Sequence, residues 1–294
     1  MVKFSNIGRC PICNSTSKSV TFPYKTLFNG ELFKYLECPS CFTVFVSPTP
    51  NENTFIRMYK KDSYHDQDYD AEVGGTYGKS VELLKGFSHN GATVLDYGCG
   101  VGGFLKSLGE QNFVPTGVEF DSDATIFASN NALCDVWTTD TFFSSCSNYN
   151  FDVIHLGDVL EHLSDPADTI RKLLPSLKTG GILFVEGPLE INPSLVYWVS
   201  RAYGWLKNIL RPGFVATYPP YHLFRVGGAQ QLDFFNTFES NLQLKYWDIY
   251  ESGWPYIECG IIKRVIANIA IFFGGKKMFN LTFGNRFNAI LIKK

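Results

Sequence analysis

The chain has 294 residues, of which 45% are hydrophobic and 18% are charged, and its formal net charge is −2 with a pI near 6.2. This length allows a large buried core and favours one large domain together with a small one. The charge balance gives no general attraction to nucleic acid, so nucleic acid is not the expected partner. An aromatic fraction of 16% suggests an aromatic-lined pocket or an apolar contact surface.

The first residues carry no apolar stretch typical of a signal peptide. No run of about 18 uncharged apolar residues occurs anywhere in the chain. We therefore expect a cytoplasmic protein without a transmembrane segment, in which the eight cysteines are kept reduced.

Two C-P-x-C units open the chain, with 24 residues between them. Four thiolates at this spacing match a tetrahedral zinc site, although buried free cysteines are the alternative and a redox pair would need only one unit. A closed four-thiolate site leaves no coordination position for substrate, so the metal would stabilise the fold and take no part in chemistry. We predict a zinc-ribbon-like domain over residues 1–47, with Cys10, Cys13, Cys38 and Cys41 as the metal ligands.

Residues 48–75 contain prolines and glycines that indicate a linker between two domains. Aromatic side chains and a histidine within it suggest a lid over substrate or cofactor instead. A partly ordered interdomain segment explains the same composition. The candidate lid residues are Tyr59, Tyr64, His65 and Tyr69.

A short apolar strand at residues 93–97 leads into a glycine-rich turn and then into helical periodicity. Gly98, Gly100 and Gly103 match G-x-G-x-x-G, the pattern in which a bare backbone turns tightly and lets a nucleotide approach. The order of strand, glycine turn and helix therefore predicts a nucleotide site.

Two carboxylates flank this turn and bear on the identity of the cofactor. Glu119 ends the next strand, residues 113–120, where it can accept hydrogen bonds from ribose hydroxyls. Asp96 precedes the first glycine, where it would repel a pyrophosphate but suits a ligand with an ammonium or sulfonium charge. We therefore expect S-adenosylmethionine in preference to NAD.

Residues 151–166, FDVIHLGDVLEHLSDP, form a further strand and the start of a helix, and they deliver Gly157 and Asp158 to the carboxyl edge of the sheet. Together with LDYGCGVGGFL and GVEFD, this segment resembles the motifs of class I S-adenosylmethionine-dependent methyltransferases. The resemblance extends from about residue 76 to the end of the chain. It implies an α/β, Rossmann-like seven-stranded methyltransferase sheet, with the last strand antiparallel, beside the small zinc ribbon.

The resemblance also implies the residues that contact the cofactor. An acidic residue after the third strand, residues 132–138, can bind the adenine amino group in this family, which points to Asp140. Phe120 lies in the acidic second-strand motif. The implied set is Asp96, Gly98, Gly100, Glu119, Phe120, Asp140, Gly157 and Asp158.

Two histidines are candidate catalytic residues. His162 belongs to D-x-L-E-H, and a histidine is well matched to removing a proton from an alcohol or phenol near neutral pH. A structural histidine at a helix start is its alternative. His222 lies in YPPYHLF, which resembles a segment that lines the acceptor pocket of related methyltransferases, with a packed loop histidine as the alternative. Tyr221 and Arg225 nearby are candidate substrate-binding residues, Arg225 for an anionic group.

Two insertions complete the expected methyltransferase domain, residues 76–294. Residues 188–227 are predicted to cap the substrate and include an amphipathic covering helix at 194–210. Residues 251–280 are predicted to be helical and apolar, with basic residues at both ends. Three interpretations of this segment stay open: a core or pocket wall, a homodimer contact, and an interfacial helix in peripheral contact with a membrane. The first two are favoured.

The expected function is methyl transfer from S-adenosylmethionine to a small hydroxylated acceptor, in which the protein aligns the acceptor with the methyl group. The zinc-ribbon arrangement resembles methyltransferases of surface-polysaccharide and natural-product pathways, which implies a sugar, nucleotide-sugar or glycan and a role in carbohydrate biosynthesis. One alternative is a nucleic-acid or protein methyltransferase that docks through the ribbon. The other is a non-catalytic, zinc-dependent scaffold.

Overall fold

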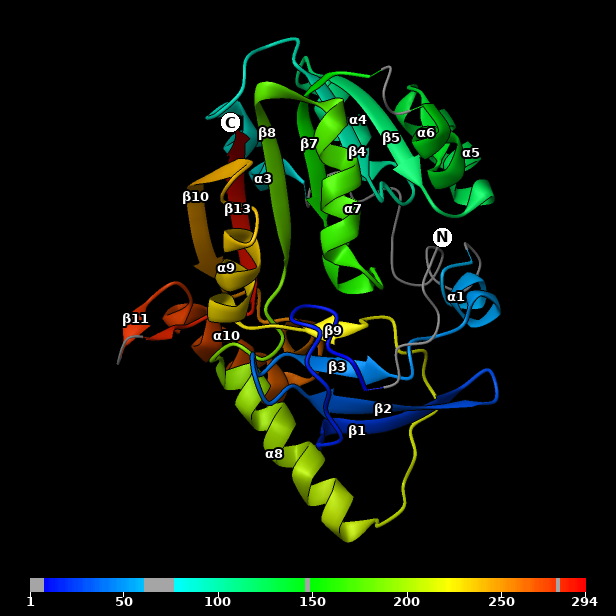
Figure 1. Ribbon diagram of the computed structural model, residues 1–294. Coiled ribbons are helices and arrows are strands. Elements are labelled where there is room, and N and C mark those ends of the chain that lie inside the picture. Colours follow the sequence, from blue (N-terminus) through cyan, green and yellow to red (C-terminus); the bar gives the residue numbers. More distant parts are fainter. Residues whose placement is uncertain (1–7, 61–76, 146–148, 279–280) are drawn as a thin grey trace.

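The computed structural model describes residues 8–60, 77–145, 149–278 and 281–294. Among the candidate lid residues, Tyr59 lies within these ranges, whereas Tyr64, His65 and Tyr69 lie outside the described residues. Figure 1 shows a large α/β unit around one sheet, and a smaller sheet below it that carries a long helix on its outer side.

The large sheet has seven strands in the order β10-β13-β8-β7-β4-β5-β6 (Figure 1). Strand β13 is antiparallel to both of its neighbours, whereas the strands from β8 to β6 pair in parallel. This confirms the predicted methyltransferase sheet with an antiparallel last strand. The strands are β4 (Thr93–Tyr97), β5 (Val114–Glu119), β6 (Val136–Thr138), β7 (Phe151–Gly157), β8 (Leu177–Pro188), β10 (Leu242–Tyr250) and β13 (Arg286–Lys293).

Helices cover both faces of this sheet, because its central strands are apolar on both sides. Val94 and Val153 pack with helices α3 and α4 on one face, while Leu95 and Ile154 pack with α7 and α9 on the other. Strand β6 is shorter than expected because Leu133 ends α5 in a left-handed conformation (φ 53°). The helices are α3 (Gly78–Lys85), α4 (Gly103–Glu110), α5 (Ser122–Ala132), α6 (Thr139–Ser145), α7 (Pro166–Leu173) and α9 (Gly228–Asn236).

The smaller sheet joins the N-terminal segment to a short strand from much later in the chain. Its antiparallel strands β1 (Val20–Phe28), β2 (Glu31–Glu37) and β3 (Val44–Ser47) come from the N-terminal segment, and α1 (Glu52–Met58) follows them. Strand β9 (Phe224–Arg225) pairs antiparallel with β3 and completes the sheet. The sheet that carries the cysteine units therefore includes two residues that follow directly on the loop of His222.

Two further helices, α8 (Leu195–Leu210) and α10 (Ile261–Phe273), pack against each other near the small sheet. Both are more exposed than the sequence predicted. On α8 Val196 is buried, but Trp205 and Leu206 are not, so it covers the small sheet with only part of its apolar face. On α10 the buried residues are Ala267 and Ala270. The remaining short elements are η3 (Leu160–His162), η4 (Leu174–Ser176), η5 (Tyr256–Glu258), β11 (Lys277–Met278) and β12 (Leu281–Thr282).

Within the part of the chain that the structure describes, no helix combines the length and the apolar character needed to cross a bilayer.

Candidate active site

The glycine turn after β4 has the backbone geometry that only glycine adopts without strain. Gly98 has φ 81°, and a Cβ there would lie 2.6 Å from Cγ2 of Val159. Gly102, which the fingerprint does not include, has φ 84° and begins α4; its Cβ would lie 2.9 Å from the Ala128 carbonyl oxygen. The turn is therefore both left-handed and tightly packed, so that side chains at Gly98 and Gly102 would not fit.

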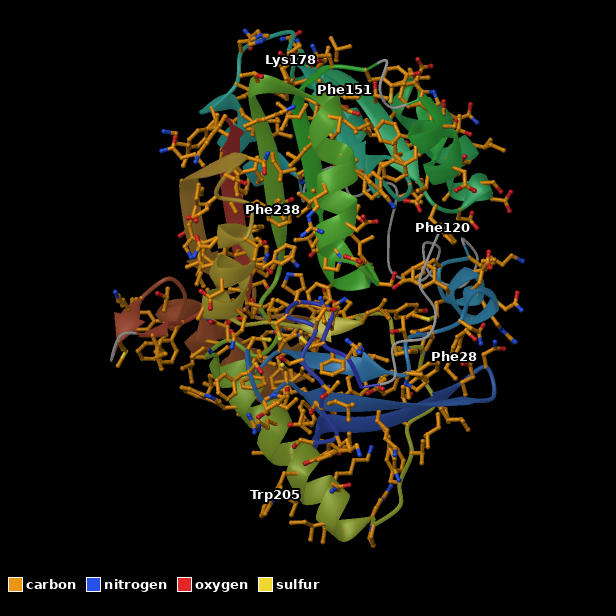
Figure 2. The ribbon with its side chains drawn as sticks, in the orientation of Figure 1. Phe28, Phe120, Phe151, Lys178, Trp205 and Phe238 are labelled. Carbon is orange, nitrogen blue, oxygen red and sulfur yellow. The ribbon has the colours of Figure 1, made fainter. Side chains whose placement is uncertain are left out.

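Glu119 lies at the carboxyl end of β5, beside this turn. Its buried carboxylate accepts a hydrogen bond from the Gly100 N–H at 2.8 Å and one from the Phe120 N–H at 2.6 Å. The Phe120 ring is 43% exposed and contacts Phe55 of α1 edge-on, with ring centroids 5.4 Å apart. Figure 2 shows Phe120 between the sheet and α1. Asp140 is exposed in the first turn of α6, next to the end of β6.

Asp96 is buried and hydrogen-bonded to a histidine that the sequence analysis did not select. Nδ1 of His155 on β7 lies 2.7 Å from Asp96 Oδ1, and its Nε2 lies 3.4 Å from Oε1 of Glu186. Burial opposes the charged imidazolium, but the two carboxylates raise the pKa of His155 to about 9. The charge of Asp96 is thus partly neutralised. A lone histidine inside an apolar strand was the signal for this pair.

Gly157 and Asp158 follow β7 at the same edge. A Cβ on Gly157 would lie 2.6 Å from the His155 ring, so glycine is required there by packing. Asp158 has φ 52°, and both of its carboxylate oxygens accept from Arg286 Nη2 at 2.7 Å. Asp158 therefore ties this loop to β13 while its side chain stays 37% exposed.

His162 lies in the short 3₁₀ turn η3, where the sequence predicted the start of a helix. The turn ends because Leu163 is extended. Nδ1 of His162 lies 2.9 Å from the Tyr59 hydroxyl and 3.0 Å from the Tyr221 carbonyl oxygen. Burial and the nearby His222 charge lower the pKa of His162 to about 3. His162 is therefore neutral and weakly basic.

His222 pairs with a carboxylate instead. Its Nδ1 lies 2.8 Å from Oε2 of Glu190, whose other oxygen lies 3.4 Å from Nε of Arg225. Although burial favours the neutral ring, the Glu190 charge and hydrogen bond raise the pKa of His222. The rings of His222 and His162 meet edge to face, with centroids 4.8 Å apart. The structure thus brings together two histidines that are 60 positions apart and gives them opposite pKa shifts.

Glu161 is a third titratable group at this point. Its side chain is buried, its Oε1 has no hydrogen-bond partner among the described residues, and burial raises its pKa to about 8. Ligand atoms of Glu161, His162 and His222 lie within 4.8 Å of one another, close enough to hold a divalent cation. The sequence analysis treated Glu161 only as part of a motif.

The two candidate substrate-binding residues lie beside the histidines. The Tyr221 ring packs on the Tyr59 ring, and the backbone carbonyl of Tyr221 accepts a hydrogen bond from the Tyr59 hydroxyl at 2.6 Å. The Arg225 guanidinium lies 5.0 Å from the centroid of the Tyr35 ring and pairs with Glu190. Arg225 therefore already has a carboxylate partner inside the protein.

The loop that carries His222 is held from both sides by backbone hydrogen bonds. The Leu223 N–H donates to the Glu161 carbonyl at 2.7 Å, and the Leu223 carbonyl accepts from the Val46 N–H on β3 at 2.8 Å. The small sheet thus fixes the position of His222 relative to η3.

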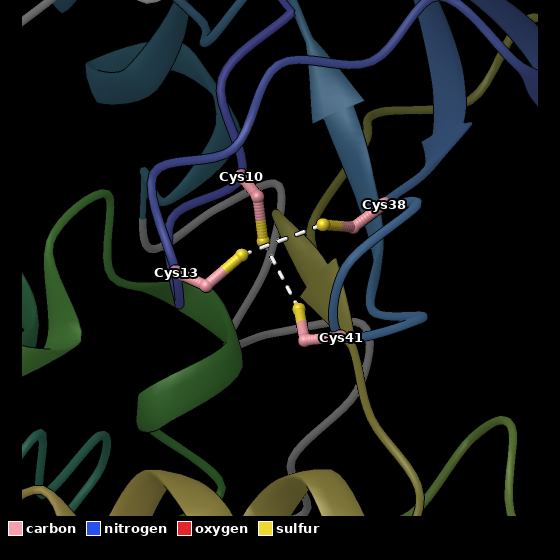
Figure 3. A group of neighbouring side chains, drawn as sticks. All are labelled: Cys10, Cys13, Cys38 and Cys41. Atoms are coloured by element: carbon pink, nitrogen blue, oxygen red, sulfur yellow. Dashed lines mark hydrogen bonds between the residues drawn. The ribbon is translucent and has the colours of Figure 1, made fainter.

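The four N-terminal cysteines converge on one point (Figure 3). Their sulfurs lie within 4.8 Å of one another, with 3.6 Å between Cys10 and Cys41 and 3.4 Å between Cys13 and Cys38. Tetrahedral zinc with Zn–S bonds of about 2.3 Å requires sulfurs about 3.8 Å apart. In each unit the N–H of the residue after the second cysteine donates to the carbonyl of the first, at 2.9 and 3.0 Å. The donor set and the repeated turn fit zinc.

The seven-stranded sheet has the fold of the class I methyltransferases. Residues 69–210 match the model of a family described as "Methyltransferase domain". It is 30% identical over 106 residues to the ubiquinone biosynthesis O-methyltransferase of Glaesserella parasuis serovar 5, which covers 33% of this chain and 45% of that protein. The corresponding enzyme of Haemophilus ducreyi is 27% identical over 135 residues, 42% of this chain and 56% of that protein. The chain thus spans about half the length of these curated relatives.

Solved structures agree on the fold. The plantazolicin methyltransferase BpumL in complex with SAH superposes with a TM-score of 0.53 at 17% identity, over 82% of this chain and 93% of that chain. A complex of the Haloferax volcanii Trm112 methyltransferase activator with its putative methyltransferase gives 0.52 at 13% identity, over 78% and 95% of the two chains. At these identities the likeness concerns the fold alone.

Proposed function

We propose that the chain transfers a methyl group from S-adenosylmethionine to a hydroxyl group of a small acceptor. One juxtaposition carries this proposal: the His222–Glu190 pair lies beside η3, which directly follows the cofactor edge of the sheet. A methyltransferase domain with a carboxylate-supported histidine has both parts that O-methylation of a weakly acidic hydroxyl needs. The names of the curated relatives, O-methyltransferases of ubiquinone biosynthesis, support a small acceptor with a reacting oxygen.

The residues of the glycine turn fit the cofactor. In our proposal Glu119 binds the ribose hydroxyls, while the backbone around Gly98 and Gly100 approaches the methionine portion. Phe120 and Asp140 flank the adenine. When bound, S-adenosylmethionine supplies a methyl group that is already electrophilic because it is attached to a sulfonium. The chain's own task is then to align the acceptor oxygen and to remove its proton.

We assign proton removal to His222 and not to His162. The Glu190 carboxylate holds the Nδ1 proton of His222, so Nε2 carries the lone pair that can accept a proton, and the same carboxylate stabilises the imidazolium that forms. His162 has a pKa lowered to about 3, which makes it a poor base at neutral pH. We propose that His162, held by Tyr59 and Tyr221, positions the acceptor.

The finer identity of the acceptor is also a proposal. The resemblance to zinc-ribbon methyltransferases of surface-polysaccharide pathways favours a sugar, nucleotide-sugar or glycan. The curated relatives are named for ubiquinone biosynthesis and not for a sugar, so we take a phenol as the alternative acceptor. Because Arg225 already pairs with Glu190, an anionic acceptor group would have to share that guanidinium. We further propose that the four cysteines bind one structural zinc ion, since the site is closed by four protein ligands.

The test has two stages. Calorimetric titration with S-adenosylmethionine should show binding that is lost in Glu119→Ala and retained in Glu110→Ala, a matched control at the exposed end of α4. Formation of S-adenosylhomocysteine is then measured with nucleotide-sugars, glycans and catechols as acceptors. Turnover with a nucleotide-sugar or glycan supports the proposed sugar acceptor. Turnover with a catechol instead shows that the acceptor is a phenol.

Three outcomes would contradict the proposal. Activity only on nucleic acid or protein would favour a macromolecular acceptor that docks through the ribbon. A folded protein that binds no S-adenosylmethionine would favour a scaffold. Full activity of His222→Ala would remove the assigned base.

A further inference from the structure

Helix α10 exposes its large apolar side chains and buries its small ones. Ala267 is fully buried, whereas Ile261 is 81% exposed, Ile262 78% and Phe272 66%. With Val265 and Ile269, which are also exposed, these residues recur at the spacing of one helix face. This face is therefore largely uncovered by the described elements, and a core role for the whole helix is excluded.

Helix α8 extends this apolar surface. Its first turns pack against α10 through Val196, and its C-terminal half exposes Tyr203, Leu206 and Leu210. Figure 2 shows Trp205 of α8 at the opposite end of the molecule from Lys178, where β8 begins. The exposed residues on this side of the two helices, here called the α8–α10 face, are Tyr203, Leu206, Leu210, Ile261, Ile262, Val265, Ile269 and Phe272.

The charged residues of the same helices are all basic. Arg201 and Lys207 on α8 and Lys263 and Arg264 on α10 are accompanied by no carboxylate on either helix, and Arg211, Lys276 and Lys277 follow directly after their ends. Glu258 of η5 is the exposed acidic residue nearest to α10 in the sequence. This local excess of cations occurs in a chain whose net charge is −2.

This charge distribution distinguishes between two occupants of the face. A two-fold dimer would bring the face against its own copy and would place cations opposite cations. An anionic bilayer surface would instead neutralise them, while the apolar side chains enter the headgroup region.

We propose that the α8–α10 face binds peripherally to bilayers that contain anionic phospholipid. The Ile261, Ile262 and Phe272 side chains enter the boundary between headgroups and acyl chains, and the lysines and arginines of both helices contact the lipid phosphates. Both helices then lie in the plane of the interface. This inference concerns a surface outside the methyl-transfer site and does not depend on the acceptor.

The test is co-sedimentation of the full chain with phosphatidylcholine vesicles, with and without phosphatidylglycerol. We expect binding only with phosphatidylglycerol and weaker binding as salt is added. Lys263→Glu together with Arg264→Glu should weaken the partition coefficient by at least about 25-fold, since each cation near an anionic surface contributes about fivefold. Lys245→Glu on β10 is the charge control and should leave binding unchanged, because Lys245 is exposed outside the face.

A second variant tests the apolar part. The double variant Ile261→Ser, Ile262→Ser should reduce vesicle binding at least about tenfold. The control variant Ile126→Ser on α5, where the isoleucine is 63% exposed, should leave vesicle binding unchanged. A thermal midpoint like that of the wild type shows that each variant is folded. Absence of binding by folded wild-type protein, or equal loss with Ile126→Ser, overturns the proposal. A lipid-free dimer that dissociates in Ile261→Ser with Ile262→Ser, without vesicle binding, would assign the face to a second copy instead.

Discussion

Replacing Glu190 by glutamine tests the assignment of the base. The partly buried Glu190 carboxylate lies 2.8 Å from His222 Nδ1 and is the main influence that raises the pKa of His222 against burial and Arg225. An opposite charge at this distance shifts a pKa by about 1 to 3 units. Glu190→Gln should therefore lower the pKa of His222 by at least about one unit, or about 1.4 kcal/mol.

The sign of the activity change follows from the role of the ring. His222 accepts a proton only when it is neutral, so kcat/KM should rise with pH through its pKa and then level off. In Glu190→Gln the rising limb should move to lower pH, because the imidazolium is less stable. The plateau should fall by about 10- to 100-fold, since the ring is a weaker base and its tautomer is no longer fixed.

The assay is the pH profile of methyl transfer with a responsive acceptor, combined with S-adenosylmethionine affinity and the thermal midpoint to confirm folding. Glu110→Gln is a matched control on the surface of α4. If the rising limb of folded Glu190→Gln coincides with that of the wild type, His222 is not the group that titrates in the profile, and the assignment is refuted.

Three further predictions concern stability and the metal. Gly98→Ala should lower the free energy of unfolding by about 1 to 3 kcal/mol and abolish S-adenosylmethionine binding, because a Cβ at this positive φ would lie 2.6 Å from Val159. Urea unfolding measures the first effect and calorimetry the second. Although partial burial acts to raise it, Lys178 and Thr93 lower the pKa of Asp152 to about 2. The Asp152–Lys178 ion pair should therefore add about 1 to 2 kcal/mol to the free energy of unfolding above about pH 4, and this contribution should be lost as the pH falls toward 2. Urea unfolding of Asp152→Asn should show a smaller pH dependence between these pH values. Cys13→Ser should contain less zinc by metal analysis. It should also lower kcat more than S-adenosylmethionine affinity, because β3 of the metal-binding segment holds the His222 loop. An unchanged metal content would contradict the four-cysteine site.

The features that the sequence predicted correctly depend on neighbours along the chain. The apolar run before Gly98 and the acidic end of β5 each lie within one strand, and the two cysteines of each C-P-x-C unit lie within one turn. Their conformations follow from local backbone preferences and periodicity. The seven-stranded order followed from the resemblance carried by these motifs.

The parts that only the tertiary structure decided depend on contacts between distant residues. His155 meets Asp96 across 59 positions, and His222 meets Glu190 across 32. A histidine inside an apolar strand indicates a buried partner, but no local pattern identifies which distant residue that partner is, and the pKa of each histidine is set by burial together with that partner. The pairing of β9 with β3 is of the same kind.

The apolar periodicity of α10 shows what a sequence pattern leaves undetermined, namely the contact partner of a hydrophobic helix face. The sequence determined that the helix has a hydrophobic face, but periodicity is the same whether that face meets a core, a second chain or a bilayer. The tertiary structure excluded the core for this face by packing Ala267 and Ala270 inward and leaving Ile261 and Ile262 exposed. A sequence therefore specifies which side of a helix avoids water, whereas the arrangement of the other elements determines how much of that side they can cover.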